Sequence, residues 1–442
     1  MRRTTAGSGS EERGTASFRA VTVPDRAIWI VIALGVLLRL VWIGVVHTSP
    51  ISDFLVYLER AKSITDGFGY AMPDGSPTAY WPVGYPAFLA LTLAAGGHHV
   101  AAAKLANVMI YVATAGVFRA IARRLRSDGA GFVSVAYLSL SPNHIAYANL
   151  LASEPLALLT VAGTFYAVVR LVGAGPPCRW LAAGCACFVA GCYVKPQLFL
   201  LPLLLALVTF QVRKDRAVLG RIAVLYAAII IAVAPWAYRN HAVFGAWVPI
   251  STNSGVNLYI GNNQSANGSY VWNQELQAPL AGLNEAEADA KAGALARRHI
   301  FQHPFRTLIL AVRKQVYLWS TDTEGIGWNL RGMQRPPWVV TAALAGLKIL
   351  SQLIYMCCLG FSLYGLLHTW KHRRTAGADL SLLWLPLVTV LYYSSLHSLF
   401  FGISRFHYVF VPFLFLYADA LFVRRDPGVA TTRAAPLTEV AA

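Results

Sequence analysis

The stretch AIWIVIALGVLLRLVWIGVV, residues 27–46, decides the class of fold. Its 20 residues are almost all apolar, which is enough for a helix to cross a hydrocarbon core of about 30 Å. The chain continues through residues 47–50 without a small-residue cleavage site, which predicts an uncleaved signal anchor with its N-terminus inside. Arg39, within this stretch, is expected to face other helices or to snorkel.

The composition of the whole chain also indicates a membrane protein. Of the 442 residues, 56% are hydrophobic and 13% are charged, whereas an ordinary soluble protein carries about 25% charged residues. This balance excludes a soluble globular enzyme, a disordered chain and a fibrous repeat. The net charge of +17 comes partly from short clusters of Lys and Arg between apolar runs. Such clusters are typical of the cytoplasmic loops of a membrane protein and not of a nucleic-acid-binding surface. These clusters are Arg119/Arg123/Arg124/Arg126, Arg213/Lys214/Arg216, Lys371/Arg373/Arg374 and Arg424/Arg425.

Further apolar runs predict an all-α, polytopic bundle of about ten transmembrane helices. After the first, the runs lie near residues 101–121, 130–147, 153–173, 179–194, 196–212, 218–236, 342–367, 380–400 and 406–423. A shorter run, Gly84 to Ala95, is expected to form a helix at the outer surface, because counting it as a span would place the cluster at 119–126 outside. The positive-inside rule then predicts that both termini are cytoplasmic.

This topology divides the chain into five parts. They are a disordered cytoplasmic tail (1–25), an N-terminal transmembrane module (26–236) that carries a first outer loop (47–100), an outer loop domain (237–340), C-terminal transmembrane helices (341–424) and a second cytoplasmic tail (425–442). Apolar spacing predicts two helices in the outer loop domain, at 284–302 and 304–320. With about 100 residues, this domain is too short to bury a large independent core.

Two acidic residues are predicted at the outer ends of spans. Asp53 follows the first span, and Glu154 opens the run at 153–173. Each has a structural interpretation, because Ser52 or Asp53 suits a helix cap and Glu154 suits a helix dipole. The catalytic interpretation is a carboxylate at the membrane surface that deprotonates an acceptor hydroxyl. If the two carboxylates converge, they either bind a divalent cation or divide the base and orienting roles.

Two cations interrupt apolar sequence at other outer ends. Lys195 precedes Pro196, and Arg405 precedes the last span. Snorkelling is one explanation for each of them. However, both cations lie on the side of the membrane that the positive-inside rule depletes of basic residues. Cations at headgroup depth suit the recognition of a phosphate group, so both are predicted to bind a donor phosphate.

Other outer residues are predicted to contact a substrate. Arg239 and Asn240 open the large outer loop, and the Gly/Asn/Ser-rich stretch that follows contains Asn262 and Asn263. Such a stretch offers amide and hydroxyl partners to a sugar, and it is equally typical of ordinary tight turns. The aromatic first loop and the segment after Arg405 add four further candidates, Tyr57, Tyr80, Tyr85 and His407.

The ordered set of these segments resembles the GT-C superfamily of polyprenyl-phosphate-sugar-dependent membrane glycosyltransferases. Most similar is the bacterial family-39-like branch, related to protein O-mannosyltransferases and the lipid A aminoarabinose transferase. The resemblance extends from about residue 50 to 415. Its segments are Asp53, Gly67-Phe68-Gly69-Tyr70, Trp81-Pro82-Val83-Gly84-Tyr85-Pro86, Ser153-Glu154, Lys195-Pro196, Pro235-Trp236 with Arg239-Asn240, Thr252-Asn253-Ser254-Gly255, Gly261-Asn262-Asn263, and Arg405-Phe406 with Pro412.

The resemblance implies roles for four residues. Asp53 corresponds to the loop-one acidic residue that acts as the base or positions it, and Glu154 to the second outer acidic residue. Lys195 and Arg405 correspond to groups near the donor phosphate. The sequence departs from the eukaryotic mannosyltransferases because a single Asp, and not an adjacent acidic pair, follows the first span.

The implied reaction is inverting transfer of a sugar from a polyprenyl phosphate to a glycolipid, polysaccharide or protein acceptor, at the outer face of a bacterial cytoplasmic membrane. The sequence leaves open whether Asp53 and Glu154 bind a divalent metal, and no other cofactor is expected. The alternatives are an O-antigen ligase or polymerase, a polytopic lipid or solute transporter, and a non-catalytic scaffold. A transporter would place ionisable groups near the middle of the membrane, whereas most here lie at predicted span ends.

Overall fold

The computed structural model describes residues 23–125, 131–172, 178–371 and 380–421. Over these ranges the chain forms helices and loops, with one isolated β-bridge between Ala71 and Pro77. Apart from residues 23–25, the two predicted tails lie outside the described residues. The same holds for five residues of the basic clusters, Arg126, Arg373, Arg374, Arg424 and Arg425.

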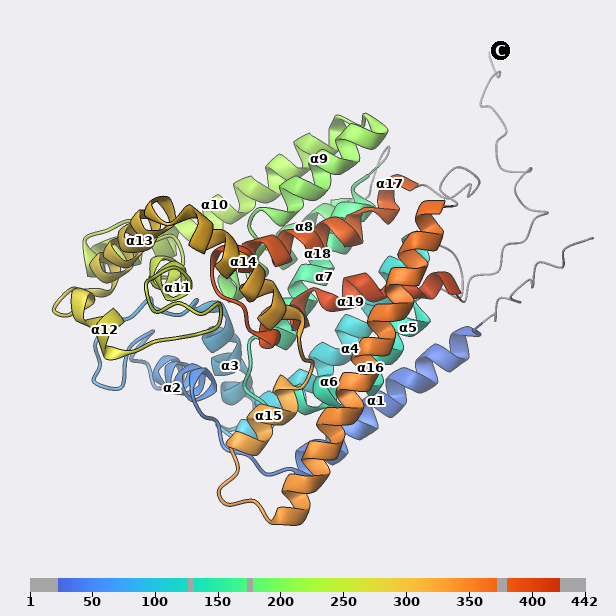
Figure 1. The fold of residues 1–442 in the computed structure, drawn as a ribbon, viewed down its shortest axis with the longest axis horizontal. Coiled ribbons are helices and arrows are strands. Elements are labelled where there is room, and N and C mark those ends of the chain that lie inside the picture. The colour runs from blue at the N-terminus through green and yellow to red at the C-terminus, as the bar shows by residue number, and fades with distance from the viewer. Residues whose placement is uncertain (1–22, 126–130, 173–177, 372–379, 422–442) are drawn as a thin grey trace, which may run out of the picture.

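The described chain contains five helical segments that are long and apolar enough to span a membrane. They are α1 (Asp25–Val45), α4 (Val100–Leu125), η1 with α9 (Pro196–Leu198 and Leu201–Arg213), α10 (Ala217–Phe244) and α16 (Trp338–Lys371). Two more helices, α7 (Glu154–Arg170) and α8 (Cys178–Val194), complete much of the bundle in Figure 1. The chain is therefore an all-α, multi-pass membrane protein, as its sequence predicts.

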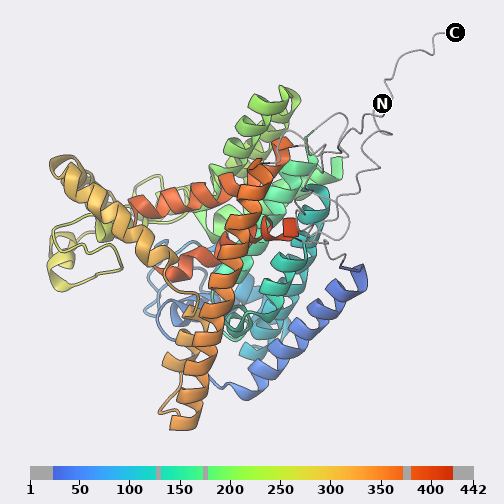
Figure 2. The ribbon, with the colours of Figure 1, turned by 45° about the vertical axis from the view of Figure 1, so that its right-hand side comes forward.

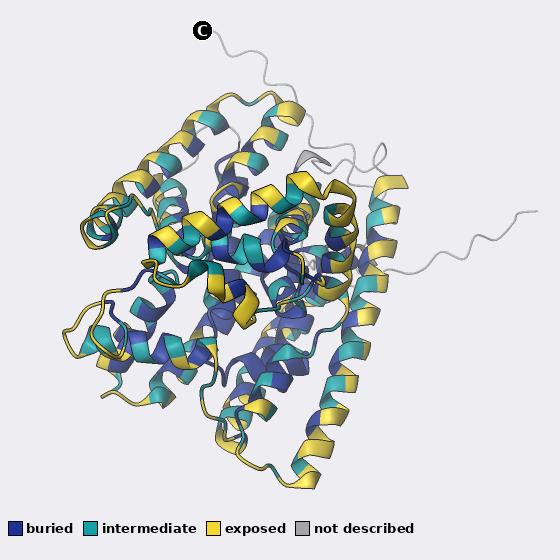
Figure 3. Cartoon of the chain, turned by 60° about the vertical axis from the view of Figure 1, so that its left-hand side comes forward, coloured by how far each residue is buried: buried dark blue, intermediate teal, exposed yellow. Residues whose placement is uncertain are grey.

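Helix α7 lies at the centre of this bundle. It packs against α4, α8 and α9, and 12 of its 17 residues are buried. Its Phe165 and the α4 residue Phe118 both contact Phe413, with ring centroids 5.0 Å apart in each pair. Figure 3 shows the result, with buried residues in the interior and exposed residues along the outer faces of the helices.

Three predicted spans are not continuous helices. The run at 130–147 divides into α5 (Phe132–Leu140) and α6 (Pro142–Tyr147), and the run at 380–400 into α17 (Leu380–Leu383) and α18 (Leu385–Leu399). The last run, 406–423, becomes η3 (Ser404–Val409), α19 (Val411–Phe415) and η4 (Ala418–Leu421). Pro142, Pro386 and Pro412 lie at these breaks, where a proline removes a backbone donor. Such irregular backbone is tolerated at membrane depth where protein surrounds it.

The remaining helices gather at one end of the bundle, which we call the site end (Figures 1 and 2). The first loop supplies α2 (Asp53–Thr65) and α3 (Gly84–Ala95). The second supplies α11 (Ser254–Gly261), α12 (Gln274–Gln277), η2 (Ala278–Leu280), α13 (Glu285–Gln302), α14 (Pro304–Trp319) and α15 (Glu324–Arg331). Helix α10 continues through the expected domain boundary at 236, so the second loop begins later than its sequence predicts.

The two helices predicted in the outer loop domain form with nearly the expected bounds. Asn284 caps α13 in a reciprocal capping box with Glu287, and Pro304 occupies the first turn of α14, where its missing N–H has no intrahelical partner to lose. Local sequence therefore specifies where both helices begin.

Glu285, in the first turn of α13, joins the two loops of the site end. Its Oε1 accepts a hydrogen bond from the Thr78 hydroxyl at 2.6 Å, and its Oε2 accepts one from the Ala79 N–H at 2.8 Å. The Thr252 hydroxyl donates to Oε2 at 3.1 Å. One carboxylate thus fixes the first loop against the second.

Candidate active site

Asp53 is the first residue of α2 and follows Ser52, whose backbone has a positive φ. Ser52 has a φ of 53°, in the left-handed region that residues with a β-carbon rarely adopt, and such backbone is frequent at functional sites. The Ser52 side chain does not cap α2. The Asp53 Oδ2 atom accepts a hydrogen bond from Arg405 Nη1 at 3.0 Å, while Oδ1 has no hydrogen-bond partner in the described part of the chain. The Asp53 side chain is 38% exposed, so one carboxylate oxygen is open to a substrate.

Arg405 connects the two predicted carboxylates. It lies in η3, and its guanidinium donates from Nε to Glu154 Oε1 at 2.8 Å and from Nη2 to Glu154 Oε2 at 3.4 Å. The third nitrogen reaches Asp53, and the guanidinium also lies 4.9 Å from the centre of the Phe54 ring. The planar guanidinium group suits two parallel bonds to one carboxylate. Arg405 therefore holds Asp53 and Glu154 in a fixed relation, although they are far apart in the sequence.

Glu154 is fully buried at the N-terminus of α7, where the helix dipole favours a negative charge. Lys195 comes from the junction between α8 and η1, and its Nζ lies 3.2 Å from Glu154 Oε1. The Lys195 side chain is 19% exposed. Two carboxylates and two cations thus form one neutral cluster, which we call the charged cluster (Asp53, Glu154, Lys195 and Arg405). The structure brings together all four residues predicted for catalysis and phosphate binding.

Tyrosine and serine hydroxyls surround the charged cluster, and those of Tyr57 and Tyr85 belong to predicted substrate contacts. Tyr57 and Tyr85 contact each other edge to face at 5.2 Å, and both interact electrostatically with Glu154 and Arg405, as does Tyr147. The hydroxyls of Tyr85, Tyr147 and Ser153 are buried without a hydrogen-bond partner in the described residues. Buried polar groups are normally paired, so these hydroxyls are suited to a water molecule or a substrate. Ser153 was identifiable beside Glu154, whereas nothing in the sequence pointed to Tyr147.

A family model described as dolichyl-phosphate-mannose-protein mannosyltransferase matches residues 81–238, which include Glu154 and Lys195. No curated protein sequence matches the chain. Among solved structures, it is similar to the Archaeoglobus fulgidus oligosaccharyltransferase in complex with Zn and sulfate. The TM-score is 0.54 at 14% identity, over 89% of this chain and 48% of that chain. The similarity to the archaeal enzyme shows a shared fold, and the family model matches part of the chain, as the resemblance to the GT-C superfamily predicts.

Other solved structures are also similar to this chain. The A. fulgidus oligosaccharyltransferase AglB, in complex with an inhibitory peptide and a dolichol-phosphate, has a TM-score of 0.50 at 12% identity, over 89% of this chain and 50% of that chain. ArnT from Cupriavidus metallidurans, bound to undecaprenyl phosphate, has a TM-score of 0.45 at 13% identity, over 90% of this chain and 77% of that chain. The chain spans about half the length of the archaeal enzyme.

Arg239 supports the first loop. Its guanidinium donates to the carbonyls of Thr78 at 2.8 Å and Tyr70 at 3.0 Å. The neighbouring Asn240 is buried and donates to the Val248 carbonyl at 2.9 Å. Tyr80 lies on the supported segment and is only partly buried. Of these predicted substrate contacts, Arg239 and Asn240 already have partners in the fold.

The later candidates are also bonded within the protein. Asn262 donates to the carbonyls of Leu258 and Leu399, and Asn263 donates to the carbonyl of Tyr259. The His407 ring contacts the Leu318 carbonyl at 2.7 Å and the buried Asp322 carboxylate at 3.2 Å. All three predicted residues are at most 3% exposed. They support the backbone around the site, and their role as substrate contacts stays a prediction.

A divalent metal does not fit the residues predicted for it. Arg405 contacts both Asp53 and Glu154, so a cation already lies between the two carboxylates. Glu154 is further neutralised by Lys195. No group of three or more His, Cys, Asp or Glu side chains suited to a metal occurs within the described ranges. Asp53 and Glu154 are therefore not suited to hold a divalent metal.

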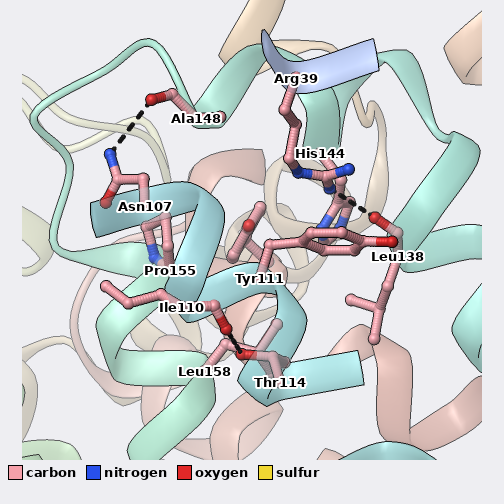
Figure 4. Close-up of a pocket in the computed structure, with 11 residues that line it drawn as sticks. Arg39, Asn107, Ile110, Tyr111, Thr114, Leu138, His144, Ala148, Pro155 and Leu158 are labelled. Atoms are coloured by element: carbon pink, nitrogen blue, oxygen red, sulfur yellow. Dashed lines mark hydrogen bonds between the residues drawn. The ribbon is translucent and has the colours of Figure 1, made fainter. Parts of the chain in front are cut away.

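A separate cavity lies deeper in the bundle and is shown in Figure 4. Arg39 lines it, is 2% exposed, and donates to the carbonyls of Leu138 at 2.6 Å and Ser139 at 3.2 Å. Its guanidinium also lies 3.5 Å from the centre of the Tyr111 ring. Of the two expectations for Arg39, the structure confirms that it faces other helices. The cavity is lined by Arg39 and none of the charged cluster.

Proposed function

We propose that this protein is a membrane glycosyltransferase that moves a sugar from a polyprenyl-phosphate donor to an acceptor hydroxyl, with inversion at the anomeric carbon. The observation that carries the proposal is the charged cluster. Its members come from four separate elements, and it combines a partly exposed carboxylate with a partly exposed cation. That pair of groups matches what the transfer needs, a base for the acceptor and a positive charge for the departing phosphate.

Asp53 is the proposed base. The acceptor oxygen attacks the anomeric carbon while its proton passes to Asp53 Oδ1, the oxygen left open by Arg405. The bond between the anomeric carbon and the phosphate oxygen breaks, and the electron pair leaves with the polyprenyl phosphate. Arg405 holds the carboxylate in one orientation.

Lys195 is the proposed contact to the donor phosphate. It is the more exposed of the two cations, and its charge stabilises the negative charge that grows on the leaving group. Arg405 is less exposed and already makes three bonds to carboxylates, so its proposed role in phosphate binding is secondary to orienting Asp53. Glu154 is a positioning residue, because it is fully buried and binds both cations.

The comparisons support a lipid-linked donor. The matching family model is described by a dolichyl-phosphate sugar, and the archaeal AglB structure contains a dolichol-phosphate. Those statements concern the related proteins. For this chain, a polyprenyl-phosphate sugar is the donor class that the cations at the site end suit best. The acceptor is a glycolipid, a polysaccharide or a protein.

The proposed location is a bacterial cytoplasmic membrane, with the site at its outer face. Arg123 and Arg124 end α4, and Arg213 ends α9. Each of these helices begins near the site end, so its basic residues lie at the opposite end of the bundle (Figure 1). Basic residues gather on the cytoplasmic side, which favours an outer active site and cytoplasmic termini.

The test is an assay of the purified protein in phospholipid nanodiscs with radiolabelled polyprenyl-phosphate sugars and total cell-envelope acceptors. A glycosyltransferase releases polyprenyl phosphate and labels the acceptor fraction. Transfer that occurs only with a polyprenyl-diphosphate-linked oligosaccharide as the donor would instead favour an oligosaccharyltransferase or a ligase. Movement of the labelled lipid across a bilayer without cleavage would favour a transporter.

A further inference from the structure

Helix α14 has two opposite faces with different surroundings. One face is buried against the protein through Leu310, Lys314 and Leu318. The other carries a line of exposed apolar side chains. Their exposed fractions are 84% for Phe305, 65% for Leu308, 56% for Ile309, 60% for Val312 and 63% for Val316. At 3.6 residues per turn these five side chains lie within an arc of about 100°. We call this line the apolar stripe.

The apolar stripe cannot turn inward, because the opposite face of α14 is fixed. Lys314 Nζ donates to Asn262 Oδ1 at 3.0 Å, to the Leu399 carbonyl at 3.0 Å and to the Ser398 carbonyl at 3.2 Å. The next residue, Gln315, donates to the Ser394 carbonyl at 2.7 Å. These bonds attach α14 to α18 and to Asn262, which follows α11.

An apolar face of this size on a folded protein marks a contact surface. Phe301, near the end of α13, is another exposed apolar residue and is 82% exposed. Figures 1 and 2 show α14 at the edge of the molecule, running across the direction of the spanning helix α16. A helix that crosses the spanning helices lies along a membrane surface and does not traverse it.

Charge indicates which surface the apolar stripe contacts. Residues 290–321 contain six Lys or Arg residues and no Asp or Glu. Arg306 and Arg313 are exposed on one flank of the stripe, with Tyr317 beside them. An apolar face bordered by cations and an aromatic residue with a polar tip is typical of a helix embedded among phospholipid headgroups.

We propose that α14 is an interfacial helix whose apolar stripe is buried in the phospholipid leaflet at the site end. This contact goes beyond the proposed sugar transfer and does not depend on it. It anchors the outer loop domain to the bilayer. Because α14 is bonded to residues 398–399, just before Arg405, the anchor also fixes the height of the charged cluster above the lipid.

The test places the photoreactive residue p-benzoylphenylalanine in place of Phe305 or Ile309 in the full chain. The protein is assembled into nanodiscs of phosphatidylcholine and phosphatidylglycerol, irradiated, and analysed by intact mass for phospholipid adducts. Ile231 is the positive control, because it is 74% exposed on the spanning helix α10. Lys291 is the negative control, because it is exposed on α13 of the same loop domain.

We expect adduct yields at positions 305 and 309 within about threefold of the yield at 231, and at least about tenfold above the yield at 291. Adducts at 231 but not at 305 and 309 would overturn the proposal. Crosslinks at 305 or 309 between two copies of the chain, in place of lipid adducts, would also overturn it and would identify a dimer contact. All these substitutions are at exposed positions, and size-exclusion chromatography confirms that each variant is folded before irradiation.

Discussion

The substitution Asp53→Asn tests the proposed base most directly. It replaces a carboxylate with an amide of nearly the same shape, which can still accept the hydrogen bond from Arg405. The amide cannot take up the proton of the acceptor's hydroxyl group. Turnover should therefore fall by at least about 100-fold, the lower end of the effect of general acid–base catalysis. This corresponds to about 2.7 kcal/mol of transition-state free energy. Donor affinity should be retained, because the proposed role of Asp53 is at the acceptor.

Protein stability should hardly change in this variant. The Asp53 side chain is 38% exposed, and exposed ion pairs typically contribute about 0–1 kcal/mol. Arg405 keeps both bonds to Glu154. Asp53→Ala should be as inactive as Asp53→Asn. Its further loss of stability should be small, because the Asp53 side chain is 38% exposed and does not act as the cap of α2.

The assay measures polyprenyl phosphate released per minute by purified variants in nanodiscs, beside their thermal midpoints. Asp74→Asn is the matched control, because Asp74 is an exposed carboxylate of the same loop that bonds only to Ser76 in the described chain. The control should keep wild-type turnover. Near-normal turnover of Asp53→Asn would refute the assignment. Inactivity with a large fall in thermal midpoint would show that Asp53 acts through the fold.

Three further predictions concern the rest of the site end. Lys195→Ala should lower donor use by about 10- to 100-fold, the loss of one charge-assisted contact, whereas unchanged donor kinetics would mean that Lys195 only snorkels. Gly255→Ala should destabilise the outer loop domain by about 1–3 kcal/mol, seen as faster limited proteolysis, because its new Cβ would lie 2.0 Å from the Asp289 carbonyl oxygen. Burial lowers the pKa of Lys314 from 10.5 to about 8, so the unfolded chain binds more protons between these values. The thermal midpoint should therefore rise with pH across that window, and the rise should diminish in Lys314→Met.

The sequence singled out the four residues of the charged cluster, whereas it was less informative about where the helices begin and end. Asp53, Glu154, Lys195 and Arg405 were identified because polar residues at the ends of apolar runs are costly and conspicuous. Helix boundaries were less predictable. The run at 406–423 has enough apolar residues for one span, yet it forms three short segments, since hydropathy measures burial and does not distinguish lipid from protein.

The amino-acid sequence by itself determined that this is an all-α membrane protein, because only helices can satisfy their backbone groups within such long apolar runs. It also determined the starts of α13 and α14, whose caps are local. Only the tertiary structure decided that Arg405 lies between Asp53 and Glu154, residues separated from it by 352 and 251 positions. It also decided that Asn262 supports Lys314. Such contacts depend on how the helices pack in space, and one helix carries no local signal of its distant partner.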